Sequence, residues 1–93
     1  AIEGLTRSLA AELAANKIRV NAIAPSLTQT PLAGALLNSP EKIEAGGKRH
    51  PLGRVGQSED IANLAGFLLN PANSWITGQI IGVDGGIGSL RTN

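Results

Sequence analysis

The stretch Ile18-Arg-Val-Asn-Ala-Ile-Ala-Pro-Ser-Leu-Thr-Gln-Thr30 decides how the rest of this sequence is interpreted. Its residues at even positions from 18 to 24 are apolar and share one face of an extended chain, and Ile23 adds an apolar group to the opposite face. Apolar residues on both faces are typical of a strand buried between helices in a parallel sheet. Pro25 has no N–H to donate to a neighbouring strand, so we predict that a strand over residues 17–25 ends there.

Three hydroxyl side chains, those of Ser26, Thr28 and Thr30, follow the predicted strand closely. Ligands of open α/β sheets bind just beyond the carboxyl ends of the strands, so these hydroxyls lie where a ligand is expected. An ordinary strand exit, in which the hydroxyls cap the next segment, explains the same pattern. The residues alone leave both interpretations open.

The rest of the chain has the pattern of an α/β protein. Apolar residues at helical spacing predict a helix over residues 1–16 and another over residues 58–70, with Ser58 as the N-cap of the second. A second strand is predicted over residues 79–83. Strands joined through helices are expected to be parallel. A parallel sheet of two strands is too small to be stable alone, so we expect the chain to be part of a larger domain.

Residues 26–50 have weaker patterns and are predicted to form a loop region at the ligand end of the sheet. Ser39, followed by proline and glutamate, indicates the start of a helix. We expect this helix to be broken after about two turns by Gly46 and Gly47. Weak helices with glycine hinges are typical of lids over ligand sites, and equally of surface connections.

Few residues outside this loop region indicate chemistry. His50 is the only histidine, has no acid close to it in the sequence, and is expected to be an exposed loop residue rather than a general base. Arg54 is expected to hold its own loop through backbone carbonyls rather than to bind an anion. The glycines of residues 82–88 resemble a phosphate-binding turn, but too few residues follow them for a phosphate-facing helix. No spacing of histidine and acids predicts a metal site.

The composition argues against several classes of function. A net charge of +1 provides no electrostatic basis for binding nucleic acid or an anionic membrane. No apolar run reaches the roughly 18–20 residues that a membrane span needs, and no signal-peptide pattern opens the chain. The absence of cysteine is consistent with a cytoplasmic protein that has neither disulfides nor thiolate metal sites.

The sequence resembles the short-chain dehydrogenases/reductases in several segments that follow one another in that family's order and spacing: residues 2–10, 18–25, 51–56, 59–62, 76–79 and 83–86. The resemblance implies the C-terminal third of a Rossmann-like, doubly wound parallel sheet. It also implies an oxidoreductase that transfers a hydride between NAD or NADP and an alcohol or carbonyl substrate. The family's phosphate-binding loop and its catalytic serine, tyrosine and lysine would precede Ala1. We therefore expect no catalytic residue in this chain and no activity from it alone.

The resemblance further implies which residues contact the cofactor. The family pattern Pro-Gly-x-x-x-Thr falls on Pro25, Ser26, Thr28 and Thr30, with the Thr28 backbone and the Thr30 hydroxyl near the nicotinamide end. Ser26 stands where the family has glycine, and a position that required the dihedral angles of glycine would be strained by serine. The match of residues 31–50 to the family's variable substrate loop names no substrate, and the segment that distinguishes NAD from NADP lies outside this sequence.

The resemblance also implies contacts between subunits, and so a homodimer or homotetramer. The alternative is a non-catalytic interaction module that associates with itself through its open sheet edge and through the leucines of its first helix. A Tyr-x-x-x-Lys motif just before Ala1 in the natural protein would distinguish the enzyme from the module.

Overall fold

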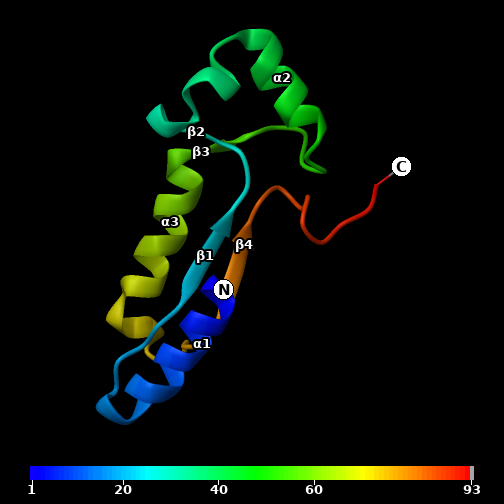
Figure 1. Cartoon of the computed structure of the whole chain (residues 1–93). Coiled ribbons are helices and arrows are strands. Elements are labelled where there is room, and N and C mark those ends of the chain that lie inside the picture. Colours follow the sequence, from blue (N-terminus) through cyan, green and yellow to red (C-terminus); the bar gives the residue numbers. More distant parts are fainter. Residues whose placement is uncertain (93) are drawn as a thin grey trace.

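The computed structural model describes residues 1–92, with helices arranged around short parallel strands (Figure 1). Strand β1 (Ala22–Pro25) pairs in parallel with strand β4 (Ile80–Val83), in a register that sets Ala22 opposite Ile80 and Pro25 opposite Val83. The two strands lie side by side at the centre of the molecule and end at the same edge. The fold is therefore α/β with part of a parallel sheet, as the sequence predicts.

Strand β1 is shorter than the predicted range of 17–25. The N–H groups of residues 17 and 18 bond to the end of the first helix, and residues 19–21 bond to the loop before β4. The Asn21 amide nitrogen donates to the Ile76 carbonyl at 3.1 Å, and the Asn21 amide oxygen accepts from the Gln79 backbone N–H at 3.1 Å. Backbone hydrogen bonds flank these contacts, from the Gly78 N–H to the Val20 carbonyl and from the Ala22 N–H to the Gln79 carbonyl, both at 2.8 Å. The Asn21 side chain therefore adds to the backbone contacts just before β1 and holds the entry of β4 in place.

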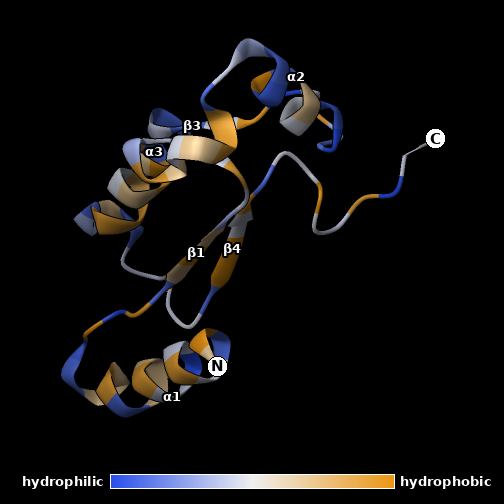
Figure 2. Ribbon diagram, turned by 45° about the horizontal axis from the view of Figure 1, so that its top comes forward, coloured by the Kyte–Doolittle hydropathy of each residue, from blue (hydrophilic) through white to orange (hydrophobic). Residues whose placement is uncertain are grey.

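Helix α1 (Ile2–Leu13) continues as a 3-10 turn over Ala14–Asn16, within the range predicted for the first helix. It is buried through Thr6 and Ala10, and Ala10 lies next to the loop that leads into β4. Larger apolar side chains of this helix face solvent, since Ile2 is 67% exposed and Leu5 is 55% exposed. Figure 2 shows this helix with its apolar residues at the end of the molecule opposite α2.

The 3-10 helix η2 (Pro31–Leu37) and helix α2 (Pro40–Lys48) lie beyond the carboxyl ends of β1 and β4 (Figure 1). The N-terminus of α2 is as predicted, because Ser39 Oγ accepts from the Lys42 backbone N–H at 3.2 Å. The prediction that Gly46 and Gly47 break this helix is wrong, since the helix continues to Lys48.

The two glycines of α2 are buried where neighbouring segments come very close. A Cβ on Gly46 would lie 2.9 Å from Val55 Cγ1, and a Cβ on Gly47 would lie 3.0 Å from the Gly53 carbonyl oxygen. Val55 is only 2% exposed. Packing therefore explains these glycines, and it outweighs their low helix propensity. The buried apolar side chains of the described residues are Ala10, Leu37, Val55 and Leu68.

Helix α3 (Ser58–Leu69) contacts β1 and begins with a different cap from the predicted one. Gln57, not Ser58, is the N-cap, and the Asp60 carboxylate accepts from the Gln57 backbone N–H at 2.7 Å in a capping box. The Asp60 carboxylate, at the third helical position, accepts from a backbone N–H that has no partner within the helix. The N-cap is therefore one residue earlier in the chain than predicted.

A second parallel pair was not predicted. Strand β2 (Thr28–Gln29), inside the hydroxyl-rich loop, pairs with strand β3 (Gly56–Gln57) just before α3. Strands of two residues have no periodicity from which a sequence could predict them. This pair fixes the loop after β1 against the start of α3. No helix of residues 1–92 combines the length and the apolar character needed to cross a membrane.

Candidate functional site

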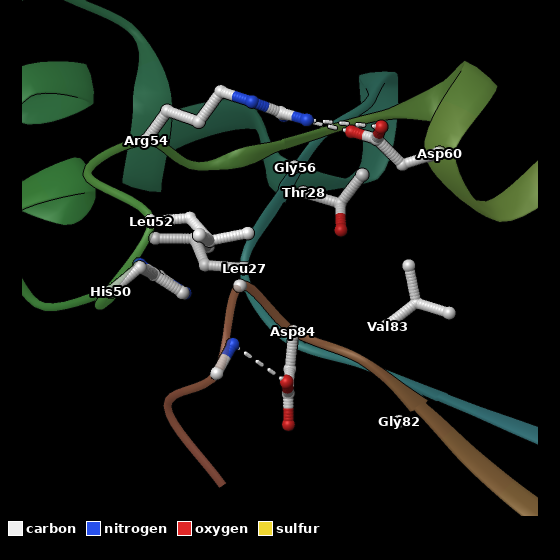
Figure 3. A pocket seen from close by; sticks show the side chains of 12 residues that line it. Leu27, Thr28, His50, Leu52, Arg54, Gly56, Asp60, Gly82, Val83 and Asp84 are labelled. Atoms are coloured by element: carbon white, nitrogen blue, oxygen red, sulfur yellow. Dashed lines mark hydrogen bonds and ion pairs between the residues drawn. The ribbon is translucent and has the colours of Figure 1, made fainter. Parts of the chain in front are cut away.

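A hollow of about 350 Å³ opens at the shared carboxyl edge of β1 and β4 (Figure 3). Its walls come from the loop after β1, from residues 50–56, from the start of α3 and from residues 82–86. Thr28, His50, Arg54, Asp60 and Asp84 contribute its polar side chains. The site therefore lies at the end of the strands where ligands of α/β sheets are expected.

The cofactor-contact residues predicted from the sequence lie together in a neighbouring hollow of about 540 Å³. Pro25, Ser26, Thr28 and Thr30 all line it. The remaining walls are mainly apolar and come from the loop after β1, from η2 and from the first turns of α3: Leu27, Leu32, Ala33, Ile61 and Ala62. The structure thus brings the predicted residues to one surface, with Leu27 and Thr28 shared between the two hollows.

Thr28 and Thr30 have different environments. The Thr28 hydroxyl donates to the Ser26 carbonyl at 2.8 Å and so closes the loop on itself. A Cβ on Gly56 would lie 2.9 Å from Thr28 Oγ1, so any larger residue at this position would force the Thr28 side chain to move. Thr30 precedes η2 and its side chain makes no capping hydrogen bond to that helix. The Thr30 hydroxyl is therefore the better placed of the two to meet a ligand.

Ser26 fits its position without backbone strain. Among the described residues other than glycine, only Lys17 has a positive φ, so the place of Ser26 does not require glycine. The Ser26 hydroxyl also gains a partner, because its oxygen lies 2.9 Å from His50 Nε2. The position thus does not require the dihedral angles of glycine, and serine is not strained there.

His50 is not the exposed loop residue that the sequence predicts. It is 5% exposed, and its Nδ1 lies 2.7 Å from the Gly46 carbonyl oxygen. Its other partner, Ser26, is 24 residues away in the sequence. Reasoning from the neighbours of His50 along the chain could not find that contact.

Arg54 fixes the loop that contains it, as predicted, but mainly by binding the Asp60 carboxylate, which the sequence did not indicate. It donates to the Val55 carbonyl at 3.0 Å, as expected, and to both Asp60 oxygens at 2.8 and 3.1 Å (Figure 3). The hydrogen bond from Arg54, together with that from the Gln57 N–H, lowers the pKa of Asp60 from 3.8 to about 2. The same hydrogen bond raises the pKa of Arg54. This bidentate pair binds the segment before β3 to the first turn of α3.

The glycine-rich turn after β4 folds around its own acid. Asp84 Oδ1 accepts from the Gly86 N–H at 2.9 Å (Figure 3). Asp84 Oδ2 accepts from the Gly88 N–H at 3.3 Å. These N–H groups are therefore engaged by a carboxylate and do not form a phosphate cradle. Within residues 1–92, no three histidine, cysteine or acidic side chains are grouped as ligands of a metal ion.

Comparisons with known proteins agree with this architecture. The family model described as enoyl-(acyl carrier protein) reductase matches residues 1–88. A tropinone reductase homolog of Arabidopsis thaliana is 50% identical over 86 residues, which cover 92% of this chain and 33% of that protein.

Two solved structures superpose on the chain. A short-chain type dehydrogenase/reductase from Mycobacterium ulcerans gives a TM-score of 0.81 at 44% identity and covers 92% of this chain and 31% of its own. The structure of ElxO with NADP bound gives a TM-score of 0.85 at 33% identity, over 96% of this chain and 36% of that one. The chain thus spans about a third of the length of the relatives that it matches. The resemblance noted in the sequence is confirmed, and the chain belongs to the short-chain dehydrogenase/reductase family.

Proposed function

We propose that this chain is the C-terminal part of an NAD- or NADP-dependent oxidoreductase and forms the nicotinamide end of its cofactor site. The observation that carries the proposal is that Pro25, Ser26, Thr28 and Thr30 line one hollow at the carboxyl edge of the parallel strands. The NADP bound to ElxO, a structural relative, supports the choice of cofactor. In this proposal the phosphate-binding loop and the proton-transferring residues lie in a preceding segment, and this chain alone is inactive.

The groups around this hollow match a nicotinamide carboxamide in their chemistry. A carboxamide has two N–H donors and one carbonyl acceptor; the Thr30 hydroxyl can donate or accept, and the Ser26 oxygen can accept. Thr28 would contribute its backbone, because its hydroxyl is bound to the Ser26 carbonyl. Leu32 and Ile61 offer an apolar wall of the kind that suits a flat ring and keeps water away.

Each part of the chain has a distinct role in this proposal. The bound cofactor supplies or accepts the hydride, and residues 25–30 orient its nicotinamide. Residues 31–50 cover the alcohol or carbonyl substrate, and Leu32 and Leu36 in η2 have exposed side chains that are free to contact it. The intact protein acts in the cytoplasm as a homodimer or homotetramer.

The test is a fluorescence titration of the intact protein with NADH and with NADPH. We expect at least one of the two to bind, and Thr30→Val to weaken that binding about five- to tenfold, since valine keeps the shape and removes one hydrogen-bonding group. Ser8→Ala, on the exposed face of α1, is the matched control and should bind as the wild type does. Absence of binding to both cofactors would contradict the proposal.

A second candidate function is a non-catalytic module that associates with itself. The apolar side chains that stay exposed on α1, together with Trp75 at 95% exposure, favour it. Such a module would form a stable oligomer and bind neither NADH nor NADPH. The same titration, combined with a measurement of mass in solution, separates the two functions.

A further inference from the structure

His50 joins three segments that are far apart in the sequence. Its Nε2 lies 2.9 Å from Ser26 Oγ in the loop after β1, and its Nδ1 lies 2.7 Å from the Gly46 carbonyl oxygen in α2. A Cβ on Gly85, in the turn after β4, would lie only 3.3 Å from His50 Cβ. The residue is 5% exposed. A buried side chain at such a junction couples the position of each segment to the other two.

The direction of both hydrogen bonds follows from the chemistry of the partners. A carbonyl oxygen can only accept, so Nδ1 carries the proton that is donated to Gly46. In a neutral imidazole Nε2 then has only a lone pair, and the Ser26 hydroxyl must donate to it. The Ser26 proton is thereby directed to His50. Toward the hollow that it lines, the Ser26 oxygen can offer only lone pairs.

We propose that Ser26 and His50 act together as positioning residues for the nicotinamide loop. His50, anchored on the Gly46 carbonyl, holds the Ser26 hydroxyl in one orientation, so that residues 25–30 present a hydrogen-bond acceptor to the carboxamide N–H groups. Because Gly46 lies in α2, the same link sets the distance between the cofactor loop and the region that covers the substrate. This inference rests on the proposed function and deepens it.

Two substitutions remove the hydrogen bond between Ser26 and His50, one from each partner. Ser26→Ala removes the hydroxyl donor, and His50→Asn keeps a side-chain N–H for the Gly46 carbonyl while losing the acceptor that Nε2 provides. Ser26→Thr retains the hydroxyl and is the conservative control. We expect each cutting variant of the intact protein to bind NADH or NADPH about five- to tenfold more weakly, which corresponds to one hydrogen bond, and Ser26→Thr to bind nearly as the wild type does.

The double variant shows whether the two residues act through one contact. If they do, Ser26→Ala combined with His50→Asn binds no more weakly than either single variant, because both remove the same hydrogen bond. Losses that multiply in the double variant would contradict the proposal. So would single variants that bind as tightly as the wild type.

Amide hydrogen exchange without cofactor provides an independent measurement. Both cutting variants should exchange faster than the wild type at residues 26–30, and their unchanged exchange in α3 would show that they are folded. Exchange at residues 26–30 that matches the wild type would overturn the proposal. A wild-type protein that binds neither NADH nor NADPH would overturn the proposed function and, with it, the cofactor role of the pair. Wild-type binding with unaffected variants would overturn the role of the pair alone.

Discussion

The Arg54 guanidinium and the Asp60 carboxylate face each other in a bidentate pair, with N–O distances of 2.8 and 3.1 Å. The same carboxylate caps the Gln57 backbone N–H at 2.7 Å. One acid therefore fixes the segment before β3, the β2–β3 pair and the first turn of α3. Since β2 lies in the loop that contains Thr28, the pair also supports the candidate cofactor site from outside it.

Lowering the pH should weaken the interactions of the Asp60 carboxylate in a defined range. The pKa of Asp60 in the folded chain, about 2, lies below its ordinary value of 3.8. The stabilisation is therefore complete above pH 3.8 and is lost as the pH falls toward 2. We expect Asp60→Asn to lower the unfolding free energy at neutral pH and to reduce its dependence on pH in this acid range.

Urea unfolding at a series of pH values measures the effect of Asp60→Asn. Glu59→Gln is the matched control, because it removes the same charge from the same helical turn without touching Arg54. An Asp60→Asn variant with the acid dependence of the wild type would show that the ion pair contributes nothing to folding.

The packing of Gly46 predicts opposite effects of one substitution at two helical glycines. Gly46→Ala would set a methyl group 2.9 Å from the buried, stiff Val55 side chain, so we expect a loss of about 1–3 kcal/mol in the unfolding free energy. Gly66→Ala, in α3, meets no atom within 4 Å and should gain up to about 1 kcal/mol from helix propensity. Denaturant titration of both variants measures the difference. A higher unfolding free energy in both variants would contradict the conclusion that close packing requires glycine at position 46.

The Asn21 side chain predicts a stability effect away from the site. Asn21→Ala removes its hydrogen bonds to Ile76 and Gln79, so we expect a loss of about 1–3 kcal/mol and faster amide exchange at Gln79. Asn63→Ala, on the exposed face of α3, is the control and should be neutral or slightly stabilising. Equal stability of the two variants would mean that Asn21 does not hold the entry of β4.

The exposed leucines of α1 predict association of the chain as it stands. We expect light scattering to give a mass well above the 9.5 kDa of one chain, since Ile2 and Leu5 are more than half exposed. Replacing both Leu5 and Leu9 by glutamine should reduce this mass. Leu32→Gln, which changes a 98% exposed leucine in η2, should not. A stable monomer at high concentration would count against the prediction.

Local patterns in the sequence were sufficient for the framework of the fold. The apolar periodicity of α1 and α3, the Ser39 cap and the parallel pairing of β1 with β4 all depend on residues close together or on general rules of chain connection. The placement of Ser26, Thr28 and Thr30 on one surface at the strand ends followed from the same rules.

The remaining features depend on contacts between distant segments. The burial of His50 requires Ser26, and the continuation of α2 through Gly46 requires Val55. Neither partner could be chosen from the sequence, because propensity and spacing describe only the neighbours of a residue along the chain. For the same reason the β2–β3 pair was not predicted.

The central claim is that this chain completes a cofactor site whose catalytic part precedes it. The measurement that tests this most directly is the intact mass of the natural protein from its source, together with its amino-terminal sequence. We predict a longer species that carries Tyr-x-x-x-Lys shortly before Ala1. A natural product of 93 residues would contradict the account.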